Sequence, residues 1–226
     1  MSGILQAVMR DFRSYGPPNN WPVNIGDAYG GGFFAGQINV SGTKYNLVVA
    51  PKASGEAVKK WGVFGTTTGI TSVINGPANT TSLVALGAAY QAAVFCNDLN
   101  AGGGLNGYTD WYLPAKNELE VLYYFLKPTT ASNYTSSGSN ANAVSPPEPI
   151  STNYSSGSPA QTTATGINGF RIGEANAFAS DYYWSSTEFN AINAYAQSFS
   201  DGYQDGNDKT NLYFSVYARA VRRIAA

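Results

Sequence analysis

The sequence of 226 residues contains no histidine and only one cysteine, Cys96. The lack of histidine excludes Ser-His-Asp and Cys-His catalysis, the H-E-x-x-H zinc site and the commonest general base at neutral pH. A single cysteine can form neither a disulfide within the chain nor a thiolate metal cluster. Because Cys96 lies in an apolar stretch that is predicted to be helical, we expect a buried core residue rather than a reactive thiol.

Charge is scarce as well. The formal net charge is -1 and only 12% of the residues are charged, so the chain has no basic field to attract phosphate backbones. Nucleic acid is therefore not expected as a partner. No apolar run approaches the roughly 20 residues that a membrane span needs, so we expect no membrane insertion. The first twelve residues lack the basic region, apolar run and cleavage site of a secretory signal, which favours synthesis in a cytoplasm without a signal peptide.

The N-terminal segment, residues 1–28, is interpreted as a unit apart. Apolar residues recur at helical spacing from Ile4 to Phe12 and end before the break at Gly16-Pro17-Pro18. A helix this short is marginal alone, so it should pack on something. Two interpretations stay open: docking on its own domain, or an anchor for oligomerisation or for a virion.

The remainder, residues 29–226, alternates between strand and helix patterns and predicts an α+β domain. Period-two alternation predicts a β-hairpin around Ser41-Gly42-Thr43, preceded by a tight turn at Gly30-Gly31-Gly32. A first helix is expected over 81–100 with Thr81 or Ser82 as its N-cap, and a second over 114–128. The strands predicted by alternation cover 33–40, 44–50, 182–186, 193–200 and 212–224, and a turn-rich segment lies at 201–208.

A low-complexity insertion interrupts this domain at about 129–166. Its Ser, Thr, Asn, Gly and Pro residues cannot bury enough apolar surface to form a core. The segment is too long for an ordinary connection, so it is either a long surface excursion or an arm that wraps another subunit.

Several residues are expected to serve the fold rather than chemistry. Trp111 and Trp184 are predicted core residues, because a tryptophan flanked by apolar strand positions buries a large area. Alternation along the last strand would place Arg219 and Arg223 on one face and Arg222 on the other. Their expected partners are carboxylates in ion pairs rather than captured anions, namely Glu118, Glu120 or Glu188.

Three motifs occur in order along the chain: GYTDWYLPAKNEL at 107–119, YWSSTE at 183–188 and ARAVRR at 218–223. Together they resemble the domain family found at the C-terminus of bacterial collagen-like adhesins and of many phage tail fibres. The resemblance implies a C-type-lectin-like fold, with two helices, antiparallel sheets and long loops. Family members usually carry Ser or Thr where this chain has Ala115, which leaves Glu118 as half of a capping box.

The same resemblance helps to exclude catalysis and calcium. Sulfatase-activating enzymes share a related fold but need paired cysteines, and this chain has only Cys96. Lectins that bind sugar through calcium carry a Glu-Pro-Asn or Gln-Pro-Asp triplet, whereas the nearest segment here is Glu148-Pro149-Ile150. The oxygen-rich residues of the segment 201–208 are then interpreted as a solvated turn. We therefore expect no enzyme activity, no metal and no cofactor.

The second half of the chain is rich in tyrosine, serine and asparagine, the mixture that antibody paratopes use. In C-type-lectin-like proteins this region presents the binding face. The candidate receptor-binding residues are Tyr195, Tyr203, Asn207, Asn211 and Tyr213. A polar β-surface with ordinary exposed tyrosines is the alternative, and the sequence leaves it open.

The sequence as a whole favours a non-enzymatic phage virion surface protein of the tail-fibre type that binds a host receptor. The receptor would be a surface glycan or an outer-membrane protein, and the other partners would be virion proteins and two further copies in a homotrimer. A structural capsid or tail decoration protein is the first alternative. A bacterial adhesin is the second, disfavoured by the missing signal peptide.

Overall fold

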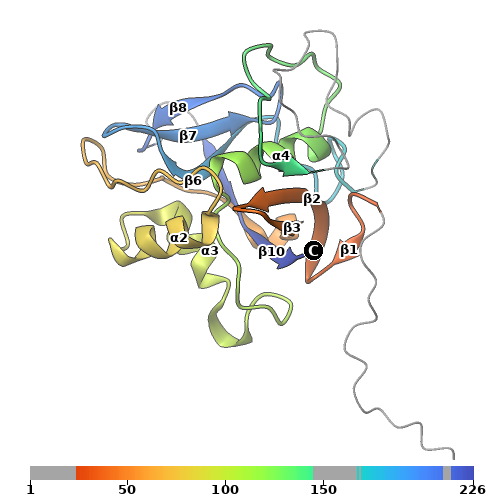
Figure 1. Ribbon diagram of the computed structural model, residues 1–226, viewed down its shortest axis with the longest axis horizontal. Coiled ribbons are helices and arrows are strands. Elements are labelled where there is room, and N and C mark those ends of the chain that lie inside the picture. Colours follow the sequence, from red (N-terminus) through yellow and green to blue (C-terminus); the bar gives the residue numbers. More distant parts are fainter. Residues whose placement is uncertain (1–23, 145–166, 168, 211–214) are drawn as a thin grey trace, which may run out of the picture.

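The computed structural model describes residues 24–144, 167, 169–210 and 215–226. Two five-stranded sheets enclose the helix α4 in this part of the chain (Figure 1). The elements in chain order are β1 (Ala28–Tyr29), β2 (Gly32–Val40), β3 (Thr43–Val49), α1 (Lys52–Gly55), β4 (Glu56–Val58), α2 (Gly76–Ala85), α3 (Gln91–Asp98), the 3₁₀ turn η1 (Ala101–Gly103), α4 (Lys116–Leu126), β5 (Ala143–Val144), β6 (Tyr182–Glu188), β7 (Asn193–Ser198), β8 (Gln204–Asp208), β9 (Val216–Arg219) and β10 (Val221–Ala225).

The first sheet has the strand order β1-β2-β3-β10, and β5 also pairs with β2. All of these pairs are antiparallel. Ser41 and Gly42 join β2 to β3 with φ angles of 51° and 92°, the positive pair that a type I′ turn requires. Gly30 and Gly31 turn β1 into β2 in the same way, with φ angles of 54° and 83°. The predicted hairpin and the predicted tight glycine turn are both confirmed.

The second sheet has the order β4-β9-β6-β7-β8. Its pairs are antiparallel except β6 with β9, which run parallel. The strand β8 occupies Gln204–Asp208, so the prediction that 201–208 is only a turn is wrong for its second half. Pairing with β7 over five residues outweighs the weak strand propensity of Asp, Gly and Asn.

The predicted final strand, 212–224, is in fact two strands in different sheets. The chain leaves β9 and enters β10 at Ala220, whose N–H donates to the Gly55 carbonyl at 2.9 Å and whose carbonyl accepts from the Ala50 N–H at 3.0 Å. Strand alternation does not continue across this change of sheet, so the prediction that Arg219 and Arg223 share one face is wrong. Residues 211–214 lie outside the described residues.

The predicted helix 81–100 is also wrong, because α2 and α3 are separate helices. Gly87, at φ 111°, lies between them in a backbone conformation that a helix cannot contain. The N-cap of α2 is Asn75, whose Oδ1 accepts from the Ala78 N–H at 3.5 Å, and Thr81 lies inside the helix. The described part of the chain thus holds four α-helices, α1 to α4, where the sequence predicted two.

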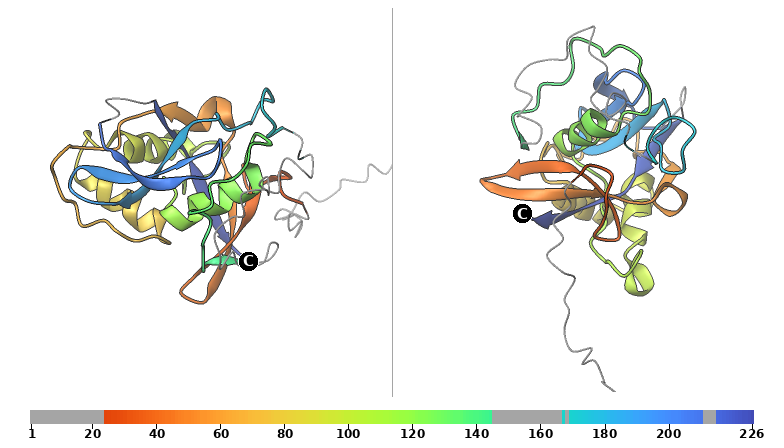
Figure 2. Two further views of the ribbon diagram at one scale, coloured as in Figure 1. Left: turned by 90° about the horizontal axis from the view of Figure 1, so that it is seen from above. Right: turned by 90° about the vertical axis from the view of Figure 1, so that its right-hand side faces the viewer.

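The helix α4 is predicted correctly and lies between the two sheets (Figure 2). Glu118 caps its start, since Oε2 accepts from the Ala115 N–H at 2.8 Å. A Cβ atom on Gly36 of β2 would come within 2.7 Å of Val121 and within 2.6 Å of Phe125. Glycine at this bulge, with φ 114°, therefore lets α4 pack directly on β2.

Two hydrophobic clusters form the core. One surrounds α4 and joins it to both sheets. The other includes Val48 of β3 and contains Trp61, Trp111 and Trp184. Trp111 is 1% exposed and Trp184 is fully buried, which confirms their predicted core role. Cys96 is also fully buried, and this burial raises the pKa of its thiol, as expected for an inert core residue.

The described part of the insertion, 129–144, packs on α4 through polar contacts. Asn140 is buried and donates from Nδ2 to the Asn117 carbonyl at 2.8 Å, and Tyr123 donates to Asn133 Oδ1 at 2.5 Å. Amide side chains thus substitute here for the apolar residues that the segment lacks. The rest of the insertion, 145–166, and the N-terminal residues 1–23 lie outside the described residues. No helix in the described part is long and apolar enough to cross a membrane.

Candidate functional site

The register of β7 and β8 decides which predicted binding residues share a face. Tyr195 pairs with Gly206 and Asn207 pairs with Ala194, so the side chains of Tyr195 and Asn207 project from opposite faces of the sheet. Gln197 and Gln204 lie on the same face as Tyr195, and Gln197 contacts Glu120 of α4. The face that carries Tyr195 is therefore the one that α4 covers. The structure does not bring the predicted site residues together as one surface.

The opposite face carries a group of tyrosines. Tyr182 pairs with Ser198, and the Ser198 N–H donates to the Tyr203 carbonyl at 2.9 Å, so these residues form one row across β6, β7 and the residue that precedes β8. Asp205 and Asn207 follow Tyr203 on this face of β8. The ring of Tyr134, from the insertion, packs edge-on against Tyr203 with 4.6 Å between ring centroids. We call this surface the tyrosine face; its members are Tyr134, Tyr182, Tyr203, Asp205 and Asn207.

Tyr203 is held in place without being buried. Its hydroxyl donates to Asp205 Oδ2 at 2.6 Å, and its N–H donates to Asp201 Oδ1 at 3.1 Å. The hydrogen bond to Asp205, with a smaller effect of burial, raises the pKa of Tyr203 to about 12. An aromatic ring fixed in this way offers contact area at little entropy cost on binding.

The tyrosine titration gives a test of this geometry. Replacing Asp205 with asparagine should lower the pKa of Tyr203 from about 12 toward the ordinary value of about 10, because the charged acceptor is lost. The folded pKa lies above the unfolded one, so the contact stabilises the fold below about pH 10 and this contribution is lost between about pH 10 and 12. A ¹³C NMR titration of labelled tyrosine Cζ measures the pKa, with Tyr203→Phe to assign the signal. An unchanged pKa in Asp205→Asn would show that the hydrogen bond does not form.

Tyr195 has a different environment. Its ring packs edge-on against Phe189 with 5.0 Å between centroids, and Lys116 Nζ of α4 lies 5.3 Å from the ring centroid. Burial, followed by the charge of Asp205, raises the pKa of Tyr195. This residue is thus engaged in packing between β7 and α4. Asn211 and Tyr213, also predicted as binding residues, lie outside the described residues.

Three members of the tyrosine face, Tyr134, Tyr182 and Asp205, were not among the predicted site residues. Tyr182 gives a signal in the sequence as the first aromatic residue of the predicted strand 182–186, and in the structure it is the residue of β6 that is not buried. Tyr134 gives a weaker signal, a lone aromatic residue in a segment of serine, threonine and asparagine. Its contact with Tyr203 depends on how the insertion folds back over the sheet.

The carboxylates of the segment 201–208 accept hydrogen bonds from nearby backbone N–H groups. Asp205 Oδ1 accepts from the Gly206 N–H at 2.7 Å, and Asp208 Oδ1 accepts from the Thr210 N–H at 2.8 Å. Among the residues that the structure describes, no group of three or more His, Cys, Asp or Glu side chains could hold a metal ion. The segment Glu148-Pro149-Ile150 lies outside the described residues.

The three C-terminal arginines each bind a different carboxylate. Arg223 pairs with Glu118 at 3.3 Å as predicted, whereas Arg219 pairs with Glu56 at 2.9 Å and Arg222 with Asp110 at 2.6 Å. The other two predicted partners bind elsewhere: Glu188 pairs with Lys209 at 2.6 Å, and Glu120 accepts from Gln197 Nε2 at 2.5 Å. The prediction of ion pairs is right in kind, but its partners are wrong for Arg219 and Arg222 because the chain changes sheets at Ala220.

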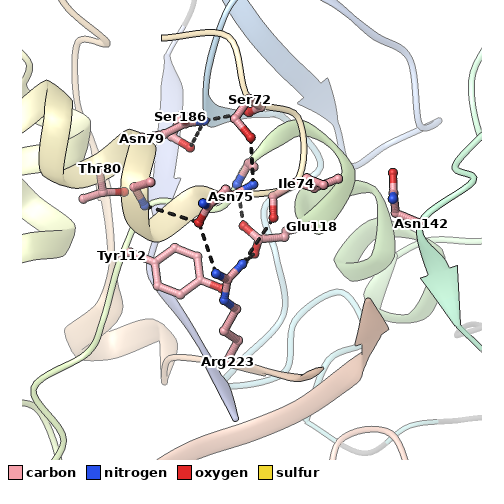
Figure 3. A network of polar contacts seen from close by, with 12 residues as sticks. Ser72, Ile74, Asn75, Asn79, Thr80, Tyr112, Glu118, Asn142, Ser186 and Arg223 are labelled. Atoms are coloured by element: carbon pink, nitrogen blue, oxygen red, sulfur yellow. Dashed lines mark hydrogen bonds and ion pairs between the residues drawn. The ribbon is translucent and has the colours of Figure 1, made fainter. Parts of the chain in front are cut away.

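The Arg223 pair belongs to a polar network that joins β10, α4 and the segment before α2 (Figure 3). Glu118 is fully buried, and its Oε1 accepts from the Tyr112 hydroxyl at 3.0 Å. Burial raises the pKa of Glu118, while the Ala115 N–H and Arg223 oppose the rise. Arg223 also donates to the Ile74 carbonyl at 3.2 Å and to Asn75 Oδ1 at 3.1 Å. The network fixes the start of α2 to the rest of the domain.

The family model of the Lcl C-terminal domain matches residues 60–222, which is more than half of the chain. The chain belongs to this family. No curated protein matches it. The match confirms the resemblance at the level of a C-terminal domain family.

The Lcl C-terminal domain match begins after β4 and ends within β10. It contains the first two sequence motifs and all but the last residue of the third. The strands β1 to β3 precede the match, yet β3 pairs with β10 over five residues. These strands and the matched segment therefore share one sheet.

Proposed function

We propose that this Lcl C-terminal domain protein is a non-enzymatic virion surface protein of the tail-fibre type, which binds a host surface glycan or outer-membrane protein. Its α+β fold would be of the C-type-lectin-like kind. The tyrosine face would form the receptor site, and other virion proteins would hold the protein on the particle.

The observation that carries the proposal is that tyrosines of the tyrosine face are held in place while they remain partly exposed. Tyr134 is 43% exposed although it packs on Tyr203, and Tyr203, which is half-buried, is fixed by Asp205. Fixed, partly exposed tyrosines next to an amide combine rigid contact area with hydrogen bonding, which is the chemistry of a recognition surface.

The environment of the buried charged groups supports a role without catalysis. Glu118, Glu188, Lys209 and Arg219 are buried in ion pairs that connect separate elements, so their polar atoms are already engaged. A general acid or base must instead reach a substrate proton.

Paired substitution of Tyr203 and Asn207 with alanine should abolish attachment of particles to host cells and leave assembly intact. Both side chains lie on the tyrosine face, and neither is buried, so the effect on stability should be small. The matched control is Tyr195→Ala, which removes a tyrosine from the same pair of strands but from the opposite face. Attachment and the protein content of purified particles are measured together.

Unchanged attachment of the paired variant would reject the receptor site. Loss of the protein from particles would favour the runner-up, a structural capsid or tail decoration protein. Exposed apolar side chains, such as Ile172 at 66% and Phe64 at 53%, are the contacts that such a role would use. A bacterial adhesin remains the third candidate, and labelled antibody on intact particles separates it from the first two.

We expect the purified protein to be a homotrimer. The apolar stripe of the N-terminal segment is too short to be stable as an isolated helix, so it should pack against other copies of the chain. Multi-angle light scattering at micromolar concentration measures the mass directly. A mass of one chain, 23.9 kDa, would contradict the prediction.

A further inference from the structure

A polar groove of about 470 Å³ lies between the helices α2 and α3, the segment before α4, and the strands β3 and β10. Its size is within the range of about 300–1,000 Å³ that is typical of small-molecule sites. It is lined by Tyr45, Pro77, Thr80, Thr81, Asn97, Asn100, Thr109, Asp110, Trp111, Tyr112 and Arg223. None of these residues belongs to the tyrosine face.

One group of lining residues forms a fixed wall. Asn100 donates from Nδ2 to the Trp111 carbonyl at 2.9 Å and accepts at Oδ1 from the Trp111 N–H at 2.8 Å. The Thr80 hydroxyl accepts from the Leu113 N–H at 3.0 Å, and the Tyr112 hydroxyl donates to Glu118. Figure 3 shows Thr80, Tyr112 and Arg223 around this wall. Because these contacts join residues of the protein to one another, the fold sets the shape of the groove.

A second group of lining residues keeps hydrogen-bonding capacity. Among the residues that the structure describes, the Asn97 amide and the hydroxyls of Thr109 and Tyr45 have no hydrogen-bond partner. Thr81 donates to the Pro77 carbonyl at 3.0 Å, which leaves its oxygen free to accept. Asp110 is held by Arg222 through both carboxylate oxygens, and its side chain is still 51% exposed. Donors and acceptors are therefore both available to a ligand.

The charge of the groove decides which ligand class fits. Its charged lining residues are Asp110 and Arg223, which have opposite signs. Each is already paired, Asp110 with Arg222 and Arg223 with Glu118. Arg223 also lies over the Tyr45 ring, 4.7 Å from its centroid. With no uncompensated charge, the groove favours a neutral ligand rich in hydroxyl groups over a phosphate, a sulfate or a cation.

We propose that this groove binds one or two neutral pyranose units of a glycan. The sugar hydroxyls would bind the Asn97 amide, the Thr81 and Thr109 hydroxyls and Asp110. The site is separate from the tyrosine face, so the protein would have two binding surfaces. Its existence does not depend on the proposed receptor function.

The test is an NMR titration of the full chain with a panel of neutral methyl glycosides and disaccharides of glucose, galactose, mannose and N-acetylglucosamine. At least one should shift the amide signals of Thr81, Asn97 and Thr109 with a Kd of about 1 mM. Asn97→Ala should weaken that binding about tenfold or more, because the ligand loses a hydrogen bond in a partly buried site. Asn97 lies in the last turn of α3, where alanine is a good helix former, and a thermal melt checks that this variant folds.

Two further samples separate the possible outcomes. Tyr203→Ala, on the tyrosine face, should bind the same sugar as the unchanged protein. A sulfated form of that sugar should bind no more tightly than the neutral form. The proposal is overturned if no sugar of the panel shifts the groove signals, if Asn97→Ala binds as well as the unchanged protein, or if only the sulfated form binds.

Discussion

Replacing Trp184 with alanine is expected to lower the free energy of unfolding by about 3–5 kcal/mol. The side chain is fully buried in the cluster that holds the three described tryptophans, and its Nε1–H donates to the Lys59 carbonyl at 2.9 Å. The substitution therefore leaves a cavity between β6 and its neighbours and an unpaired carbonyl. Trp111→Ala should fall in the same range, since Trp111 is 1% exposed.

Urea unfolding, followed by circular dichroism, measures the effect, and Tyr134→Ala is the control. Tyr134 is 43% exposed, so its loss should cost less than about 1 kcal/mol. If Trp184→Ala costs no more than this control, Trp184 does not occupy the core.

Replacing Arg219 with methionine is expected to lower the free energy of unfolding by about 3–5 kcal/mol as well. The Arg219 side chain is fully buried; Nη1 lies 2.9 Å from Glu56 Oε2, and Nε and Nη2 both donate to the Ala50 carbonyl. Burial lowers the pKa of Arg219, and the charge of Glu56 opposes this. Methionine keeps much of the volume but removes the cation at 2.9 Å from the Glu56 carboxylate, whose side chain is 4% exposed and which then keeps Lys52, at 3.6 Å, as its ion-pair partner.

The double variant Arg219→Met with Glu56→Gln provides the matched control. It removes both charges, so it should recover part of the stability that Arg219→Met loses. Tyr183 also donates to Glu56, at 2.8 Å, and this contact survives with glutamine as the acceptor. A double variant no more stable than Arg219→Met would assign the loss to packing instead of charge.

Local patterns in the sequence were sufficient where local chemistry decides the structure. The glycines at 30–31 and 42 fix two turns, and Glu118 with Pro114 marks the start of α4. Helix propensity alone could not show that Gly87 ends α2. Gln204–Asp208 becomes a strand only because β7 lies beside it. Such pairing is a tertiary effect that composition does not contain.

The candidate site was also predicted only in part, for the same reason. Tyr203 and Asn207 were predicted and share a face, while Tyr195 was predicted and lies on the opposite one. A prediction that treats 201–208 as a turn cannot say on which face of the sheet each side chain lies. That placement follows from the register between β7 and β8. Tyr134 joins the site from the insertion through its ring contact with Tyr203. The polar groove likewise combines α2, α3 and β10, whose mutual placement depends on the change of sheet at Ala220.

The central claim is that the tyrosine face contacts a host receptor, and the most direct measurement is a binding titration of the purified protein on intact host cells. Three proteins are compared at equal folded concentration: the unchanged chain, Tyr203→Ala with Asn207→Ala, and Tyr195→Ala. The account predicts saturable binding by the unchanged chain and by Tyr195→Ala, and loss of binding by the paired variant. Equal binding by all three proteins would contradict it.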